Sequence, residues 1–295
     1  MQNWRSEFKR LEGAYAPATM RSYYSDVEIF VAWCELQGRL PFPALIDTVC
    51  AFLESQAPAL ATSTVRRRLY AIRKAHRLLR LCDPTFDEEI NLTLRRIRRS
   101  KLARPKQAKG LTLDYLEKFL AVQPDDSWGL RNRALLSLGY DLLARRSELV
   151  ALRTEDIEYR HDGTLRVIIR RSKADPFGSG RIAFTSKRTG DLVRAWLACR
   201  EANIAWLFCP IYQGKPIDRG LSTTTVKRII KCTAKEAGLS SRDVAEFSGH
   251  SMRVGAAQDL LNAGHDTASI MRAGGWKSVN VLTRYLEQAQ HNVWT

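Results

Sequence analysis

The sequence predicts a mainly α-helical protein of two domains, of which the second carries a small β-sheet. Its 295 residues exceed the size at which a single hydrophobic core usually stops growing. Apolar residues recur at three- and four-residue spacing along most of the chain, as they do on the buried face of a helix. In the second half, two strand-like runs flank a turn-rich segment, which is the pattern of a β-hairpin.

The first hundred residues predict a small bundle of four or five helices. The first long helix is expected to begin at Ala18 and to end at Gly38, because glycine commonly stops a helix. Three further apolar stripes predict helices over residues 43–56, 63–80 and 87–99.

A basic linker is expected after this bundle. Apolar periodicity lapses over residues 100–110 while positive charge persists, and this composition is typical of an exposed connection. We therefore predict a helical domain at residues 1–103, a linker at 104–110 and a second domain at 111–295.

The second domain mixes helices with strands. Thr112 is expected to cap its first helix, an apolar helix is expected over residues 130–143, and residues 149–157 lead out of it. Residues 165–170 and 181–185 predict the two strands of the hairpin. Apolar periodicity predicts the remaining helices at residues 191–202, 222–237, 250–263, 267–273 and 279–288.

The charge of the chain points to nucleic acid. The formal net charge is +16, and the stretch from Ala61 to Gly110 holds fifteen Lys or Arg against four Asp or Glu. Clustered cations gain affinity for a polyanion by displacing counterions from its phosphates. A role of the charge in solubility alone is the alternative. The basic residues expected to contact DNA are Arg66, Arg67, Arg68, Arg73, Lys74, Arg77, Arg104, Lys106 and Lys109. Any one of them alone fits a solvated helix face equally well.

Other classes of protein are not favoured. The six cysteines lie far apart and form no metal-binding or disulfide pattern, so we expect them to be small core residues. No signal peptide and no run of 18 apolar residues is present, which predicts a cytoplasmic protein, associated with the nucleoid if the source is prokaryotic. A phosphate-binding GxxxxGK[ST] loop and a carboxylate cluster suited to Mg²⁺ are also missing from the sequence, so neither cofactor nor metal is expected.

Short motifs in the second domain carry the functional signal. They are the run Ala144–Leu149, Lys173 in the hairpin, His250–Arg253, and Gly274–Trp276 followed nine residues later by Tyr285. In this order and spacing they resemble the tyrosine recombinase (phage integrase) family. The runs HSMRVGAA and AGGW resemble in particular its Cre-type branch.

The resemblance is strongest from Tyr140 to Leu286 and extends to the first domain at the level of architecture. It implies a helical core-binding domain and a catalytic domain that close on double-stranded DNA as a C-shaped clamp. It also implies a homodimer on inverted half-sites and a homotetramer in the synapse, with exchange of strands through a Holliday junction. Only ten residues follow Tyr285, which is short for the segment that the Cre-type branch passes to a neighbouring subunit.

The residue types suit transfer of a phosphodiester to a phenol. The pentacoordinate phosphorus carries extra negative charge on its non-bridging oxygens, and two guanidiniums can bind these oxygens bidentately. Arg145 and Arg253 are the candidates, since the family motif places its first arginine three residues before an acidic residue, here Glu148. Arg146 remains the alternative to Arg145. Glu148 would orient a neighbouring basic side chain.

The resemblance assigns the other roles. Tyr285 is the nucleophile of a 3′-phosphotyrosyl intermediate, and Lys173 is the general acid for the departing 5′ oxygen, with Lys187 as its competitor. His250 is a general base or a donor to the phosphate. Trp276 carries a donor-only indole N–H that can bind a phosphate oxygen or support the nucleophile helix. Each of these residues alone also fits an ordinary structural role.

Two other functions use the same residues. A type IB topoisomerase relaxes DNA with a similar set, and a regulator that has lost catalysis binds DNA only. The AGGW run and the separate helical domain favour a recombinase over the former, and the intact set of candidate residues disfavours the latter.

Overall fold

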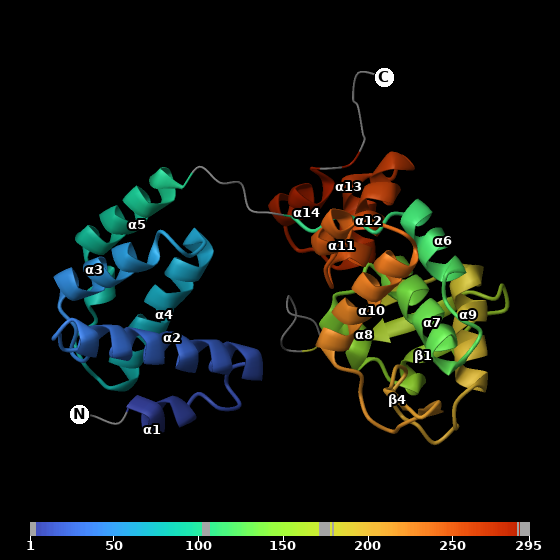
Figure 1. Cartoon of the computed structure of the whole chain (residues 1–295), viewed down its shortest axis with the longest axis horizontal. Coiled ribbons are helices and arrows are strands. Elements are labelled where there is room, and N and C mark those ends of the chain that lie inside the picture. Colours follow the sequence, from blue (N-terminus) through green and yellow to red (C-terminus); the bar gives the residue numbers. More distant parts are fainter. Residues whose placement is uncertain (1–3, 102–106, 171–177, 179, 288, 290–295) are drawn as a thin grey trace. The chain divides into compact units, whose positions relative to one another are not determined.

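The structure is a computed structural model that describes residues 4–101, 107–170, 178, 180–287 and 289. It divides into two compact units, Met1–Pro105 and Lys106–Thr295, and each has its own hydrophobic core (Figure 1). Among the described residues, no helix is long and apolar enough to cross a membrane.

The first unit is a bundle of helices (Figure 1), and aromatic and aliphatic side chains fill its core. Its elements are α1 (Trp4–Lys9), α2 (Pro17–Leu36), α3 (Ile46–Gln56), α4 (Thr62–Leu78), the 3₁₀ turn η1 (Pro84–Phe86) and α5 (Glu88–Ser100). The first long helix ends at Gly38 as predicted. The last residue of α2 is Leu36, and Gly38, two residues later, adopts the left-handed conformation with a φ of 63°. The Asp87 carboxylate caps α5 by accepting from the N–H of Glu89 at 2.9 Å.

One buried histidine joins two segments of this bundle. Nε2 of His76, on α4, accepts from the N–H of Ala44 at 3.0 Å, and Nδ1 lies 2.9 Å from the carbonyl of Ile72. The ring is therefore neutral, with its proton on Nδ1. Burial is the main cause that lowers the pKa of His76.

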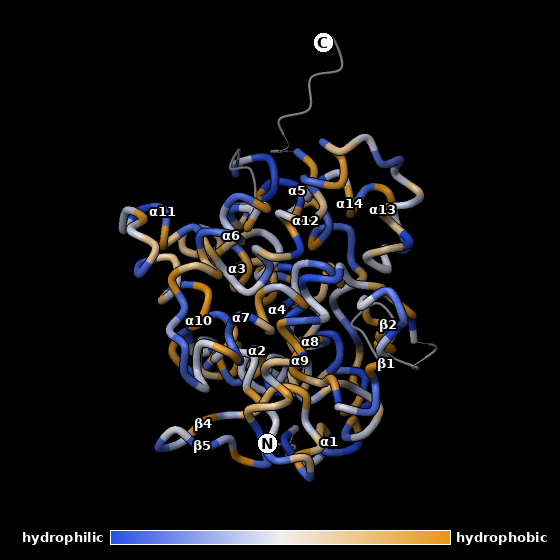
Figure 2. The backbone as a smooth tube through the Cα atoms, turned by 90° about the vertical axis from the view of Figure 1, so that its right-hand side faces the viewer, coloured by the Kyte–Doolittle hydropathy of each residue, from blue (hydrophilic) through white to orange (hydrophobic). Residues whose placement is uncertain are grey.

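The second unit places helices around a small antiparallel sheet. Its helices are α6 (Leu113–Ala121), α7 (Ser127–Asp141), α8 (Arg146–Ala151), the 3₁₀ turn η2 (Thr154–Asp156), α9 (Lys187–Ala198), α10 (Thr223–Glu236), α11 (Ser241–Glu246), α12 (Ser251–Asn262), α13 (Thr267–Gly274) and α14 (Val279–Leu286). Its strands are β1 (Ile157–Tyr159), β2 (Leu165–Ile169), β3 (Arg181–Phe184), β4 (Ile211–Tyr212) and β5 (Lys215–Pro216). Figure 2 shows that hydrophobic and hydrophilic stretches alternate along these helices, as expected when each buries one face.

The predicted β-hairpin is present as β2 and β3, which pair antiparallel with Val167 opposite Ala183. A third strand, β1, adds to the free edge of β2 in the order β1-β2-β3. Leu165 and Val167 alternate with less buried neighbours and face the core, which follows from the two-residue period of a strand. The structure also has two short helices, α8 and α11, that the sequence analysis did not predict.

Close packing between α7 and α12 fixes the centre of the second unit. A Cβ on Gly139 of α7 would lie 2.6 Å from the sulfur of Met252 on α12, so this glycine lets the two helices approach. Both helices are buried along most of their length. The end of α7 and the start of α12 therefore form a rigid base for the side chains that follow them.

Two local expectations are corrected. Thr112 precedes α6 as predicted, but its side chain makes no capping hydrogen bond, and the N–H of Leu113 donates instead to Asp259 at 2.7 Å. The cysteines are all free, yet only two of the six are fully buried, and Cys82 and Cys232 are exposed.

Candidate active site

The end of α7 sets the position of the first candidate arginine. The N–H of Leu143 donates to the carbonyl of Tyr140 at 2.9 Å, and that of Ala144 to the carbonyl of Gly139 at 3.0 Å. This is a Schellman ending, in which one residue adopts the left-handed conformation, and here Leu143 does so with a φ of 47°. A bulky side chain is unusual there. Arg145 follows two residues later, at the N-terminus of α8.

Arg145 is held by a buried carboxylate. Its Nη1 donates to Oε1 of Glu148 at 2.6 Å, and its backbone N–H donates to Oε2 at 3.2 Å. The Glu148 side chain is only 1% exposed, and that of Arg145 is 15% exposed. A charge-assisted contact of this kind fixes the direction of the guanidinium. The acidic residue three positions after Arg145 thus contacts it directly.

Arg253 lies at the centre of the site and has no exposed surface. Its Nη1 donates to the carbonyls of Leu143 and, at 2.8 Å, of Gly274. Its Nε and Nη2 are buried and have no hydrogen-bond partner in the described part of the chain. Burial and the neighbouring Arg145 lower the pKa of Arg253 to about 10, so the side chain stays cationic at neutral pH.

Trp276 and Tyr285 cover the Arg253 guanidinium. The guanidinium carbon lies 3.6 Å from the centre of the Trp276 ring and 5.8 Å from that of the Tyr285 ring. The two rings meet edge to face with their centres 5.3 Å apart. The indole Nε1 of Trp276 is buried without a partner among the described residues. Tyr285 lies in α14, and Gln258 donates to its backbone carbonyl at 3.2 Å.

His250 occupies the N-cap position of α12, and its ring is exposed. Its backbone N–H donates to the hydroxyl of Ser248 at 3.1 Å. The alternative arginine, Arg146, lies beside this turn, because a Cβ on Gly249 would be 2.6 Å from its Cδ. The two arginines therefore have different neighbours. Arg145 donates to Glu148, whereas Arg146 lies beside Gly249.

The remaining predicted residues either fall outside the described part of the chain or make other contacts. Lys173, Arg104 and Lys106 lie outside the described residues. The competitor Lys187 begins α9 and is exposed, with its aliphatic stem against Gly163 in the turn between β1 and β2. Lys109 donates to Asp243 at 2.5 Å.

Arg181 is a residue of this site that was not predicted from the sequence. It begins β3, its side chain is 15% exposed, and its Nη2 lies 3.6 Å from Oε2 of Glu148. Burial lowers the pKa of Arg181, and the carboxylate of Glu148 opposes this shift. The two-residue period of a strand could have indicated that Arg181 points inward, because it lies on the same face of β3 as buried Ala183.

Arginines of α4 in the first unit fall into two groups. Arg67 donates to both oxygens of buried Asp26, at 2.7 and 2.9 Å, and Nε of Arg68 lies 3.7 Å from the same carboxylate. Lys74 donates to the hydroxyl of Tyr15 at 2.9 Å. The contacts with Asp26 join α4 to α2, and that of Lys74 joins α4 to the segment before α2, so these residues have a structural role.

The second group forms a row with aromatic rings. It consists of Arg66, Tyr70, Arg73, Phe86 and Arg77, with each guanidinium carbon 4.2 to 5.5 Å from a ring centre. Phe86 is 59% exposed and Tyr70 is 37% exposed, so the row lies at the surface. We call these five residues the arginine–aromatic row. Such a preordered set of cations suits a phosphate backbone.

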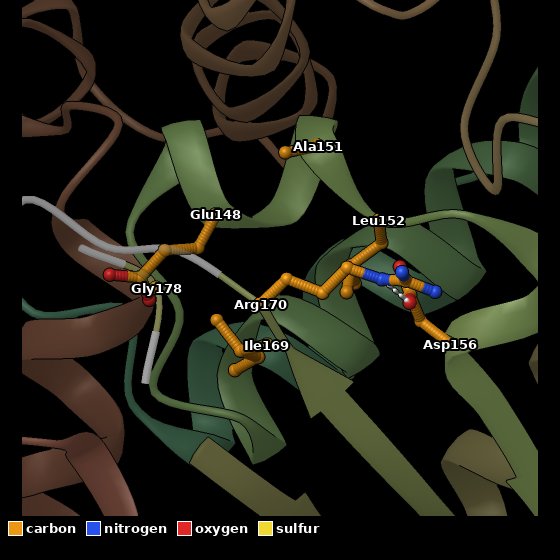
Figure 3. A pocket seen from close by; sticks show the side chains of 7 residues that line it. All are labelled: Glu148, Ala151, Leu152, Asp156, Ile169, Arg170 and Gly178. Atoms are coloured by element: carbon orange, nitrogen blue, oxygen red, sulfur yellow. Dashed lines mark hydrogen bonds and ion pairs between the residues drawn. The ribbon is translucent and has the colours of Figure 1, made fainter. Parts of the chain in front are cut away.

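A pocket of about 360 Å³ lies next to Glu148, between α8 and β2. Figure 3 shows Glu148 and Gly178 on one side of it and Arg170 extending across to pair with Asp156 on the other. Arg253 and Tyr285 do not line it. We therefore do not assign the chemistry to this pocket.

The central site can bind an anion beside a phenol. Arg145 and Arg181 form ion pairs with the carboxylate of Glu148, and Arg253 interacts electrostatically with both Arg145 and Glu148, which leaves a net positive charge. Unpaired N–H donors of Arg253 and Trp276 lie next to the Tyr285 ring. In the described part of the chain, no group of three or more His, Cys, Asp or Glu could hold a metal ion. A family model described as the phage integrase family matches residues 109–292, which include this whole site.

The chain belongs to the phage integrase family. It is 29% identical over 292 residues to the recombinase Cre of Escherichia phage P1, covering 92% of this chain and 84% of Cre. It is also 29% identical to an integrase/recombinase XerD homologue of Selenomonas ruminantium, over 95% of this chain and 84% of that protein. The chain is therefore a tyrosine recombinase by family, as its motifs predict.

Solved structures share the fold. The XerH site-specific recombinase bound to a palindromic difH substrate, in a post-cleavage complex, matches with a TM-score of 0.66 and 20% identity, over 90% of this chain and 75% of that one. A lambda integrase dimer bound to a COC′ core site matches with a TM-score of 0.62 and 18% identity, over 99% and 78% of the two chains. The predicted fold class, mainly helical with a small sheet, is thus confirmed.

Proposed function

We propose that this phage integrase family member is a site-specific DNA recombinase that cleaves and rejoins double-stranded DNA through a 3′-phosphotyrosyl bond to Tyr285. Strands would be exchanged between paired inverted half-sites through a Holliday junction. The observation that carries the proposal is a set of unsatisfied buried donors. Nε and Nη2 of Arg253 and Nε1 of Trp276 lack partners among the described residues, next to the Tyr285 ring.

Such donors indicate a ligand rich in acceptor oxygens. A buried N–H without a partner costs about 1–3 kcal/mol, so native structures rarely keep one without a use. A phosphodiester would supply the missing acceptors. Arg253 would bind its non-bridging oxygens together with Arg145, and Glu148 would keep the Arg145 guanidinium in the binding direction.

The reaction then transfers one bond at phosphorus. The Tyr285 hydroxyl oxygen attacks, the bond from phosphorus to the 5′ oxygen breaks, and a 3′-phosphotyrosyl ester forms. His250 would take the phenolic proton or donate to the phosphate, and Lys173 would give a proton to the departing 5′ oxygen. Attack by that 5′ hydroxyl, or by one from a partner strand, reverses the step and releases Tyr285.

We also propose the division of labour along the chain. Residues 1–103 would be the core-binding domain, residues 104–110 a linker near phosphates, and residues 111–295 the catalytic domain. Two copies would occupy one site and four the synapse. Binding of DNA as a dimer is supported by the lambda integrase dimer bound to a core site, and binding of a palindromic site by the XerH complex, since both share the fold.

The test is to trap a covalent adduct. The protein is incubated with supercoiled plasmid and with fragments of its source DNA, without Mg²⁺ or ATP, beside a Tyr285→Phe control. We expect an adduct on denaturing gels with the wild type only. DNA binding without an adduct in either protein would leave a DNA-binding module. Relaxation of any plasmid without exchange of strands would instead indicate topoisomerase activity.

A further inference from the structure

We propose that Arg181 is a positioning residue of this active site. Its guanidinium joins the C-terminal ends of α7 and α13, and thereby holds Arg145 and Trp276, which follow these ends, at the distance that the chemistry needs. The inference rests on the proposed function and adds a residue to it.

The two helices end in the same way. Like α7, α13 closes with a Schellman motif, in which the N–H of Trp276 donates to the carbonyl of Met271 at 2.9 Å and that of Gly275 to Arg272 at 3.3 Å. Gly275 takes the left-handed conformation with a φ of 64°. In both helices the carbonyls at the very end have no partner within the helix, and the helix dipole makes this end negative.

Two arginines bridge these ends in parallel. Arg181 donates from Nη2 to the carbonyl of Leu142 at 2.8 Å and from Nη1 to that of Ala273 at 2.7 Å. Arg253 donates to the carbonyl that comes next in each segment. The bridged carbonyls are therefore consecutive on both sides: Leu142, Leu143, Ala273 and Gly274.

The two bridging arginines differ in what remains for a ligand. Arg253 uses one nitrogen on the backbone and keeps two unpaired buried nitrogens beside Tyr285. Arg181 uses both terminal nitrogens on the two helix ends, and one of them also lies near Glu148. We therefore give Arg181 a positioning role and leave phosphate binding to Arg253.

The local backbone shows why a second bridge is useful. Leu143 sits in a left-handed conformation that a branched side chain disfavours, and the carbonyls on both sides of its Cα are each bound by an arginine. On the other helix, a Cβ on Gly275 would be 2.8 Å from Cδ of Arg181, so the arginine lies directly on this backbone. Without Arg181, we expect the two ends to separate slightly.

The experiment compares three variants with wild-type protein. Arg181→Met removes the bridge, and Arg181→Lys keeps a charge that can reach one carbonyl. Arg200→Met is the matched control, because Arg200 is also buried and donates to a backbone carbonyl, that of Ile204 at 2.7 Å, in the same unit. Adduct formation is followed in single turnover on the DNA that the wild type cleaves. In parallel, fluorine NMR of 5-fluorotryptophan-labelled protein reports on Trp276, whose signal is assigned with Trp276→Phe.

We expect Arg181→Met to slow adduct formation by about 10²-fold, as a displacement near 1 Å can do, with DNA affinity nearly unchanged and the Trp276 signal shifted. Arg181→Lys should recover part of the rate. Arg200→Met should change neither rate nor signal. A wild-type rate and signal in Arg181→Met, or an equal loss of rate in Arg200→Met, would overturn the proposal. If the wild type forms no adduct, the proposed function fails, and the Trp276 signal alone decides on Arg181.

Discussion

Arg253 combines structural hydrogen bonds to the backbone with nitrogens that have no partner among the described residues. It is fully buried, yet the protein uses only one of its three nitrogens among the described residues. Stacking on Trp276 at 3.6 Å offsets part of the cost of burying the charge. Because its lowered pKa is still about 10, the side chain stays cationic at neutral pH.

The indole N–H of Trp276 can be tested apart from its packing. Trp276→Phe keeps a ring under Arg253 and against Tyr285 but removes the unpaired donor. If this donor binds the transition state, adduct formation should fall by about 10²-fold, as on loss of one oxyanion-hole donor. Single-turnover cleavage and thermal unfolding of the same samples measure the two effects.

Trp196→Phe is the control for that prediction. The Nε1 of Trp196 is also buried but donates to the carbonyl of Leu207 at 2.8 Å within the core. Its removal should lower the unfolding temperature by a few degrees and leave the cleavage rate unchanged. A rate loss that is equal in the two variants would indicate that Trp276 acts through packing alone.

At the scale of elements, α4 presents two kinds of arginine. Arg66 belongs to the arginine–aromatic row, whereas Arg67 donates twice to the buried carboxylate of Asp26. We expect Arg66→Gln to weaken DNA binding and to reduce the salt dependence by about one phosphate contact. Arg67→Gln should mainly lower stability, because it removes both hydrogen bonds to buried Asp26 and leaves only the more distant Arg68, at 3.7 Å, beside that charge.

Titration of DNA binding against salt and chemical denaturation measure both variants. If Arg67→Gln lost as much affinity and salt dependence as Arg66→Gln, without a loss of stability, the division of α4 into two groups would be wrong. From the sequence, both arginines were expected to contact DNA, because the sequence does not show that Asp26 lies beside Arg67.

The chain segment that leads into the second unit packs closely against Gly255 of α12. A Cβ on Gly255 would lie 1.9 Å from the carbonyl oxygen of Leu111, which is backbone and cannot turn away. A Cβ on Gly110 at the same contact would meet the side-chain oxygen of Gln258, which can move. We expect Gly255→Ala to cost on the order of 3 kcal/mol and Gly110→Ala clearly less. Urea denaturation distinguishes them, and equal costs would contradict the packing described.

The sequence predicted the long helices and the hairpin better than the short elements. The helix predicted at residues 222–237 is α10 (Thr223–Glu236), because its apolar period repeats over several turns. The helices α8 and α11 have only six residues each and no full apolar period, so tertiary contacts rather than pattern stabilise them. In the same way, Arg181 escaped notice because the two carbonyls that it binds, those of Leu142 and Ala273, lie far from it in the sequence.

At the scale of the whole molecule, charge and chemistry are divided along the chain. The exposed arginine–aromatic row lies in the first unit, and the residues around Tyr285 lie in the second. In the sequence, the basic stretch from Ala61 to Gly110 likewise precedes the motifs of the second domain. What the sequence could not give is which cations are already paired, since partners such as Asp26 and Arg67 are 41 residues apart.

A buried histidine makes the first unit sensitive to mild acid. His76 is neutral when folded, and its pKa is lowered from 6.5, mainly by burial, while Asp83 opposes the shift. Unfolded chains therefore bind a proton that the folded unit does not, so its stability is full above pH 6.5 and falls as the pH drops below that value. We expect amide hydrogen exchange, corrected for intrinsic rates, to show weaker protection of α4 at about pH 5.5 than at about pH 7.5.

His76→Gln should remove this dependence, because its amide oxygen can still accept from the N–H of Ala44 but does not titrate. Peptides of α10 in the second unit provide the internal reference. Because pH 5.5 lies only one unit below 6.5, the loss of opening free energy in the wild type should be at most about 1.4 kcal/mol. If His76→Gln lost the same protection in acid, or if α10 lost as much as α4, other groups would be responsible. A neutral buried histidine holding Ala44 would then not be the source of acid sensitivity.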